Sequence, residues 1–229
     1  MEPIIIKQTD DLVAVFKPSG WLSIPGRLKA PVLLEWLKQK IGPVWVVHRL
    51  DLETSGVMIF ARTEEKHRLL NYWFQERLIK KTYHCIARGD PNLPMFKIST
   101  PVRNVRASTQ VEVLEKYTCG FLAQVKPLTG RRHQIRIHFY QMGYPLFGDM
   151  KYGGIREISL EGENLVIPRV ALHSYSLELP TGEVFQTQWP EDFWDWVKKL
   201  KKGKKKFERQ NLYFKTLLAT NAYELRHHH

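Results

Sequence analysis

The chain has 229 residues, of which 43% are hydrophobic and 25% are charged, so it can bury a core and is too apolar to be intrinsically disordered. The 35 Lys and Arg residues exceed the 23 Asp and Glu residues and give a formal net charge of +12. The longest apolar runs, such as residues 56–61, are far shorter than the roughly 18 residues that a membrane-spanning helix needs.

The positive charge makes nucleic acid the first class of partner to consider, because clustered cations attract a polyanion and release its counterions. A basic surface that only maintains solubility is the alternative. The two cysteines, Cys85 and Cys119, form no C-x-x-C motif, so we expect neither a disulfide framework nor a zinc site. The first residues lack the features of a secretory signal, and we expect a cytoplasmic protein.

Short strands and helices alternate irregularly along the first half of the chain. A β-prone run at residues 11–16 ends at a Pro- and Gly-containing turn at residues 17–20. Apolar residues at helical spacing predict a helix at residues 31–41, followed by Gly42. Residues 45–47 and 56–62 then read as strands on either side of a turn-rich loop. A second helix is expected from Thr63, a suitable N-cap, to about Leu78.

The second half of the chain contains more strands, without a regular β-α rhythm. This order favours an α+β fold with a mostly antiparallel sheet over a doubly wound one. A helix is also expected to begin near Trp189. The expected strands cover residues 80–89, 108–117, 121–127, 170–179 and 183–188.

The basic segment at residues 129–145 fits either a strand or a helix. We favour a helix, because Gly143 and Pro145 follow it as typical C-terminal signals. On such a helix Arg132, Arg136 and Tyr140 would share one face, away from the apolar stripe.

Five motifs together resemble those of the RluA-type pseudouridine synthases. Residues 48–56 match H-R-L-D-x-x-T-S-G at every specified position, and Lys81 and Tyr83 match K-x-Y. Three later segments complete the set in the order of the family: residues 129–138 (T-G-R-R-H-Q-I-R-I-H), 148–153 (G-D-M-K-Y-G) and 171–173 (A-L-H). The resemblance implies a pseudouridine synthase fold, which is a curved mixed sheet with flanking helices and a central basic cleft.

The same resemblance implies the catalytic roles. Asp51 corresponds to the nucleophile, Arg136 to the arginine that pairs with it, and Tyr83 to the tyrosine that stacks on the target uracil. A carboxylate is a suitable nucleophile for this isomerisation, at the anomeric carbon of the ribose or at carbon 6 of the base. A fixed cation would keep it ionised in a partly apolar pocket. Ile137 is a candidate for the apolar wall opposite Tyr83, although core packing would explain it equally well.

The resemblance also implies contacts to RNA and a reaction that uses no metal or other cofactor. A paired uridine must be flipped out of its stem, and Arg49 corresponds to the residue that fills the vacated space. Lys17, Arg131 and Arg132 are candidate phosphate contacts, and Arg132 replaces the Thr or Ser that is common in the family. His48 and His133 are expected to orient the loop by hydrogen bonding. No metal or other cofactor is expected, and the chain is expected to act as a monomer on a tRNA or rRNA stem-loop.

We expect one catalytic domain at residues 1–209 and a tail at residues 210–229, whose last three histidines resemble a purification tag. The RNA-binding domain that precedes the core in many relatives is not expected, so substrate choice would rest on the catalytic domain, with residues 90–107 as a candidate specificity loop. The seven lysines within residues 198–206 would form either a solvated face or an extension of the phosphate-binding track.

Two other functions compete with this interpretation. One is a non-catalytic RNA-binding protein on the same scaffold, which would gain nothing from a buried carboxylate that faces a polyanion. The other is a carboxylate-dependent glycosidase, which would need a second acid near Asp51, and Glu53 is the nearest one in the sequence.

Overall fold

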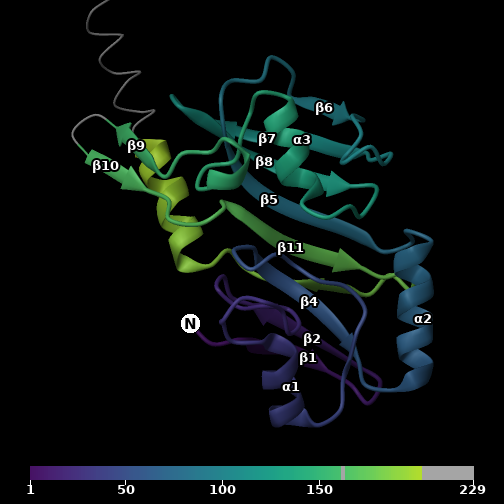
Figure 1. Ribbon diagram of the computed structural model, residues 1–229. Helices are drawn as coiled ribbons and strands as arrows, with labels where there is room; N and C mark the ends of the chain where they lie inside the picture. Colours follow the sequence, from purple (N-terminus) through teal and green to yellow (C-terminus); the bar gives the residue numbers. More distant parts are fainter. Residues whose placement is uncertain (161–162, 203–229) are drawn as a thin grey trace, which may run out of the picture.

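The computed structural model describes residues 1–160 and 163–202 and contains a ten-stranded sheet with helices packed on both faces (Figure 1). The helices are α1 (Leu33–Ile41), α2 (Glu64–Gln75), α3 (Gln134–Gln141), the short 3₁₀ helix η1 (Met150–Tyr152) and an unlabelled helix at residues 191–202. The strands are β1 (Ile4–Gln8), β2 (Leu12–Lys17), β3 (Trp45–Val46), β4 (Ser55–Ala61), β5 (Lys80–Arg88), β6 (Met95–Ile98), β7 (Thr109–Lys116), β8 (Gly120–Pro127), β9 (Glu157–Leu160), β10 (Glu163–Val166), β11 (Leu172–Glu178) and β12 (Val184–Gln186).

The strand order in the main sheet is β1-β2-β4-β11-β5-β8-β7-β6, with β3 paired to β4 and β12 paired to β11. Strands β4 and β11 run parallel, and the other strand pairs within the described residues are antiparallel. Strands β9 and β10 form a separate hairpin. The α+β class with a mostly antiparallel mixed sheet is therefore confirmed.

Alternating apolar residues on β2 and β4 bury both faces of the N-terminal half of the sheet. Val13 and Val15 pack with Leu33 and Leu37 of α1 on one face. Leu12 and Ala14 face the other way and lie in the cluster that includes Leu70 and Trp73 of α2. Since the side-chain period of a strand is two residues, this pattern requires a helix on each face.

The C-terminal half of the sheet is built in the same way around β5 and β8. Cys85, Ala87, Phe121 and Ala123 pack with Ile135 and Phe139 of α3. Ile86 and Leu122, on the opposite face, pack with Phe193, Trp196 and Leu200 of the helix at residues 191–202. Phe193 and Trp196, two of the aromatic residues that follow Trp189, thus belong to the core, as the sequence indicated, whereas Trp194 is exposed.

Tyr83 of β5 marks the junction between the two halves, because it packs against both the α1 cluster and the α3 cluster. These two helices therefore cover the same face, and Tyr83 lies between them. The loop that follows β3 and the N-terminus of α3 meet at this junction. The candidate site lies there.

Gly56 permits the parallel contact at the centre of the sheet. Its φ of 126° lies in a region that side-chain-bearing residues rarely adopt, and a Cβ atom there would overlap the backbone of Ser174 on β11. The glycine that ends the first motif is therefore required for packing, and it sets the position of the loop immediately before it.

Most expected elements are present, within a few residues of their predicted ends. Thr63 caps α2 by accepting a hydrogen bond from the Lys66 backbone, as predicted. The sequence did not predict β6, which lies inside the proposed specificity loop, or the hairpin of β9 and β10. Within the described residues, no helix is long and apolar enough to cross a membrane. The tail at residues 210–229 and the last residues of the lysine run lie outside the described part of the chain.

The helical assignment of residues 129–145 is correct, but the predicted faces are wrong. Helix α3 begins only at Gln134, because His133 has left-handed backbone angles with a φ of 59°. Arg132 therefore lies outside the helix and is exposed, and Tyr140 is also exposed, whereas Arg136 is buried with 5% of its surface accessible. Arg136 points into the molecule to meet two carboxylates.

Candidate active site

A cavity of about 710 Å³ opens beside the loop that contains Asp51. Residues from five segments line it: the Asp51 loop, the end of α2 with the turn after it, the start of β5, the β8–α3 connection with the first turn of α3, and the start of β11. Three exposed or half-buried arginines, Arg49, Arg131 and Arg132, lie at its wall together with Arg77 and Lys81. The apolar part of the lining includes Tyr83, Ile135 and Leu172. The cavity is thus shaped for a ligand with a flat apolar part and an anionic part.

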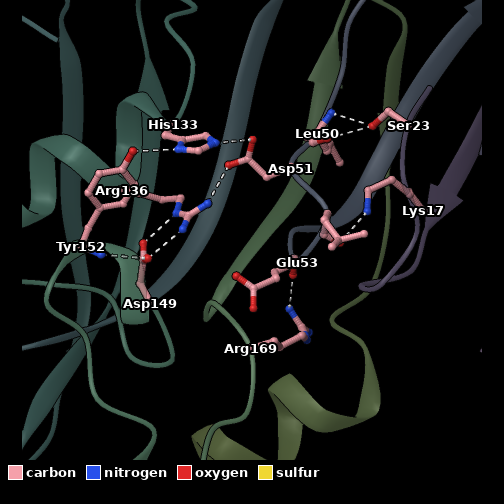
Figure 2. Close-up of polar contacts among 11 residues, drawn as sticks. Lys17, Ser23, Leu50, Asp51, Glu53, His133, Arg136, Asp149, Tyr152 and Arg169 are labelled. Carbon is pink, nitrogen blue, oxygen red and sulfur yellow. Dashed lines mark hydrogen bonds and ion pairs between the residues drawn. The ribbon is translucent and has the colours of Figure 1, made fainter. Parts of the chain in front are cut away.

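The Asp51 loop is fixed through its backbone. The Leu50 carbonyl accepts a hydrogen bond of 2.9 Å from the Ser23 hydroxyl, and the Asp51 carbonyl accepts one of 3.1 Å from the Thr54 amide. The Leu52 carbonyl accepts from Lys17 at 3.2 Å, and that of Glu53 accepts from Arg169 at 3.3 Å (Figure 2). Four consecutive carbonyl groups therefore have partners, and the loop holds the Asp51 side chain in one position.

Arg136 joins Asp51 to a second, fully buried carboxylate. Its Nη1 donates to Asp51 Oδ2 at 3.1 Å, while its Nε and Nη2 donate to the two oxygens of Asp149 at 2.7 Å each (Figure 2). Burial alone would lower the pKa of Arg136, but the hydrogen bonds and charges of Asp149 and Asp51 raise it instead. Arg136 is therefore a permanent cation beside Asp51. The predicted pairing of Arg136 with Asp51 is present.

Asp149 belongs to the fourth motif, but the sequence analysis assigned it no role. It is inaccessible to solvent and also caps η1 by accepting a hydrogen bond from the Tyr152 amide at 3.3 Å. With Nε and one N–H of Nη2 directed at Asp149, the guanidinium is oriented so that Nη1 meets Asp51. The acid that follows Gly148 was visible in the sequence, but its pairing with Arg136, 13 residues upstream, was not.

His48 and His133 reach the site from opposite sides. The ring of His48 stacks on Phe74, and its Nε2 accepts a hydrogen bond of 3.0 Å from the Ile59 amide. Burial lowers the pKa of His48 to about 3, so it is a neutral acceptor, in agreement with the orienting role that was predicted. His133 contacts Asp51 Oδ1 through Nε2 at 3.4 Å, and its Nδ1 lies 2.8 Å from the hydroxyl of Tyr152.

Two residues of the predicted site have other roles. Lys17 was expected to contact phosphate, but it is completely buried and its Nζ donates to the carbonyls of Pro18, Trp21 and Leu52. Burial and the nearby charge of Arg169 lower its pKa to about 7. Ile137 was expected to form the wall of the base pocket, but it packs with Val102 and Ala107 outside the cavity, and Ile135 lines the cavity instead.

The remaining predicted residues lie where a ligand can reach them. Tyr83 lines the cavity, and burial raises the pKa of its phenol to about 12. Arg49 is exposed at the wall, as is Arg132, and Arg131 donates to the Arg106 carbonyl at 3.2 Å. Burial and the charge of Arg77 lower the pKa of Lys81. No group of His, Cys, Asp and Glu residues suitable for a metal ion occurs in the described part of the chain.

A carboxylate beside a permanent cation, in a basic cavity with an aromatic wall, is an arrangement suited to a polyanionic ligand with a flat ring. The sequence comparison agrees: the family model described as RNA pseudouridylate synthase matches residues 11–141, which is more than half of the chain. The chain belongs to the RNA pseudouridine synthase family.

Individual relatives are similar over most of their length. The chain is 32% identical over 205 residues to tRNA pseudouridine synthase C of Yersinia pestis, covering 76% of this chain and 80% of the relative. It is 33% identical over 195 residues to the dual-specificity RNA pseudouridine synthase RluA of Escherichia coli K12, with 77% and 86% covered. The solved structure of human RNA pseudouridylate synthase domain containing 4 superposes with a TM-score of 0.73 at 26% identity, covering 86% of this chain and 92% of the human one. The RluA-type resemblance and the pseudouridine synthase fold are confirmed.

Proposed function

We propose that this chain converts uridine to pseudouridine in a stem-loop of tRNA or rRNA, with Asp51 as the nucleophile. The observation that carries the proposal is the Asp51 carboxylate in the wall of the basic cavity, held by Arg136. One relative is named a tRNA pseudouridine synthase, which supports tRNA as a substrate, and another is named a dual-specificity RNA pseudouridine synthase. Location in the cytoplasm and action as a monomer are parts of the proposal, and the free thiols of Cys85 and Cys119 are compatible with a reducing compartment.

The reaction breaks the bond from the ribose C1′ to N1 of uracil and forms a bond from C1′ to C5. Asp51 attacks at C1′ or at C6, which forms a covalent bond to its carboxylate. The base then turns so that C5 bonds to C1′, and the bond to the Asp51 carboxylate breaks, which releases the nucleophile unchanged. The proton on C5 passes to a base, and N1, which no longer carries the ribose, takes up a proton. The sum is an isomerisation, so no oxidant, reductant or external group takes part. The role of Arg136 is to keep Asp51 ionised and oriented while the cavity is filled.

Tyr83 provides the surface on which the flipped base stacks. Its ring lies in the cavity wall near Leu172 and Ile135, which offer apolar contact to the base. With a pKa of about 12 its phenol is protonated at neutral pH. Tyr83 therefore acts as a stacking platform and a hydrogen-bond donor, and it is not an ionised base in the resting enzyme.

The basic residues at the cavity wall hold the RNA. Arg49 is exposed next to the Asp51 loop and is positioned to occupy the space that the flipped uridine leaves. Arg131 and Arg132 on the β8–α3 connection face Arg77 and Lys81 on the α2–β5 side. We assign phosphate contacts to these four residues, which replaces the earlier assignment to Lys17.

The competing functions are less well supported. A glycosidase needs a second carboxylate that is free to act, but Asp149 is saturated by Arg136 and Glu53 does not line the cavity. A protein that only binds RNA would lose affinity by exposing the Asp51 carboxylate to phosphates.

The test is to incubate the purified protein with unmodified transcripts of tRNA and of rRNA fragments, digest the RNA to nucleosides and quantify pseudouridine by liquid chromatography and mass spectrometry. We expect pseudouridine at a defined uridine in at least one RNA class, and none with Asp51→Asn. Tight RNA binding by the native protein with no pseudouridine in any transcript would refute the proposal and favour the RNA-binding alternative.

A further inference from the structure

His133 occupies an unusual position directly before α3. Its φ of 59° places it in the left-handed region, which costs energy for a residue with a side chain, although histidine tolerates it better than most. This backbone conformation turns the ring toward the site, where 9% of the side chain remains accessible. Each ring nitrogen faces one polar group: the Tyr152 hydroxyl at Nδ1 and Asp51 Oδ1 at Nε2 (Figure 2).

The two partners determine which nitrogen of His133 carries the proton. Burial lowers the pKa of His133, as do the charges of Arg136, Arg132 and Lys151, while Asp51 raises it, and the net effect is a pKa below the ordinary 6.5. The ring is therefore neutral at neutral pH and has a single N–H group. The ionised Asp51 can only accept, and the Tyr152 phenol is able to donate. The arrangement compatible with both contacts has Tyr152 donating to Nδ1, which leaves the ring proton on Nε2, the nitrogen that lies 3.4 Å from Asp51 Oδ1.

We propose that Tyr152 and His133 are positioning residues for the nucleophile: Tyr152 fixes the tautomer of His133, and His133 in turn holds Oδ1 of Asp51. This inference rests on the proposed role of Asp51. Arg136 holds Oδ2 at 3.1 Å, so each carboxylate oxygen of Asp51 has one neighbouring group that restricts its rotation. A nucleophile that is fixed in this way needs less reorganisation to reach the attacking geometry.

The residues that contact Asp51 on both sides depend on Asp149. Its Oδ1 and Oδ2 fix Arg136, and Oδ1 also accepts from the Tyr152 amide as the cap of η1. The ring of Tyr152 packs beneath the Arg136 guanidinium, with the Cζ atom 5.1 Å from the ring centroid. The motif at residues 148–153 therefore supplies, through Asp149 and Tyr152, the frame for both oxygens of the nucleophile.

The first test is Tyr152→Phe, which removes the hydroxyl and retains the ring against Arg136. We expect kcat for pseudouridine formation to fall about tenfold, because the proton of His133 is then free to move to Nδ1 and leave a lone pair facing Asp51. The KM and the Kd for RNA should stay unchanged, since Tyr152 lies behind the nucleophile. The matched control is Tyr140→Phe on the exposed side of α3, where no effect is expected.

The second test compares two amide substitutions of His133. His133→Gln places its NH₂ group near the position of Nε2 and can still donate to Asp51, whereas His133→Asn reaches only the position of Nδ1. We expect kcat of His133→Gln to stay within about threefold of the native value and kcat of His133→Asn to fall at least tenfold, at similar melting temperatures. A role in folding alone would not produce this order, because Asn tolerates left-handed angles better than Gln.

The outcomes distinguish the positioning role of Tyr152 and His133 from the proposed function. If the native protein forms no pseudouridine, the proposed function fails. If the native protein is active but Tyr152→Phe matches Tyr140→Phe, or His133→Asn is as active as His133→Gln, the positioning role is overturned while the proposed function stands.

Discussion

Asp149 holds the guanidinium of Arg136 through two hydrogen bonds of 2.7 Å and so orients Nη1 of Arg136 toward Asp51. The proposed nucleophile is thus positioned, through Arg136, by a second carboxylate that does not line the cavity. The pair lies where the N-terminus of α3 meets the Asp51 loop, next to the junction of the two halves of the sheet at Tyr83. Packing of the sheet and geometry of the site are therefore linked through a few buried charges.

Asp149→Asn should lower both stability and activity. The amide would place N–H groups against the guanidinium and leave the Arg136 charge partly unpaired in a buried position, which costs about 3 kcal/mol. Urea unfolding measures the loss. Glu64→Gln is the control, because the Glu64–Arg68 pair is exposed and worth less than about 1 kcal/mol. Equal unfolding free energies for Asp149→Asn and the native chain would contradict the described network.

Gly56→Ala should lower the unfolding free energy much more than an alanine substitution at another glycine with a positive φ. Gly56 and Gly182 both have positive φ angles, but a Cβ at Gly182 meets no atom within 4 Å, whereas one at Gly56 overlaps the backbone of Ser174. Gly182→Ala should cost about 1 to 2 kcal/mol of unfolding free energy from backbone strain alone. Gly56→Ala should exceed this cost and also reduce kcat, because it displaces the loop of Asp51. Similar losses of unfolding free energy at the two positions would contradict the close approach of β4 to β11 at Gly56.

His173 should make the fold sensitive to acid. It is fully buried between the hydroxyls of Ser55 and Thr187, and burial, together with Arg169, lowers its pKa to about 3. The unfolded chain therefore binds a proton near pH 6.5 that the folded chain does not, so stability is present above pH 6.5 and is lost as the pH falls toward 3. Between pH 6.5 and 5.0 we expect His173 to account for a loss of about 1.5 kcal/mol.

The contribution of His173 can be isolated by urea unfolding of native protein and His173→Asn between pH 5.0 and 7.5. The variant should be less stable at neutral pH but should lose less stability on acidification. An identical pH dependence for the two proteins would assign the acid sensitivity to other groups.

Arg131→Ala and Arg132→Ala should each weaken RNA binding in a salt-dependent manner. Loss of one phosphate contact reduces the slope of log K against log salt by about 0.7 for single-stranded RNA. Fluorescence anisotropy at several salt concentrations provides both affinity and slope. Lys38→Ala on the exposed surface of α1 is the control and should change neither. If Lys38→Ala had the same effect, binding would depend on net charge and not on the cavity wall.

The sequence was sufficient for the fold class and most elements, because alternation, turns and caps are local signals. It was not sufficient for β6, whose short run includes the exposed Met95, or for the hairpin of β9 and β10. At the site, the motifs pointed to Asp51, Tyr83 and Arg136, and the three residues line one cavity. They misplaced Lys17, because a lysine next to a turn is usually exposed, and a cation buried on three carbonyls is a tertiary feature. Ile137 was misassigned because the left-handed His133 delays the start of α3 and so changes which isoleucine faces the cavity.

The central claim is that Asp51 is the nucleophile and that its carboxylate is needed for chemistry and not for binding. The most direct measurement is single-turnover release of tritium from RNA labelled at C5 of uridine, with native protein and Asp51→Asn, and with RNA affinity measured on the same samples. We predict release by the native protein, no detectable release by Asp51→Asn, and an affinity of the variant that is equal to or higher than native. Release by Asp51→Asn at a rate close to native would contradict the account.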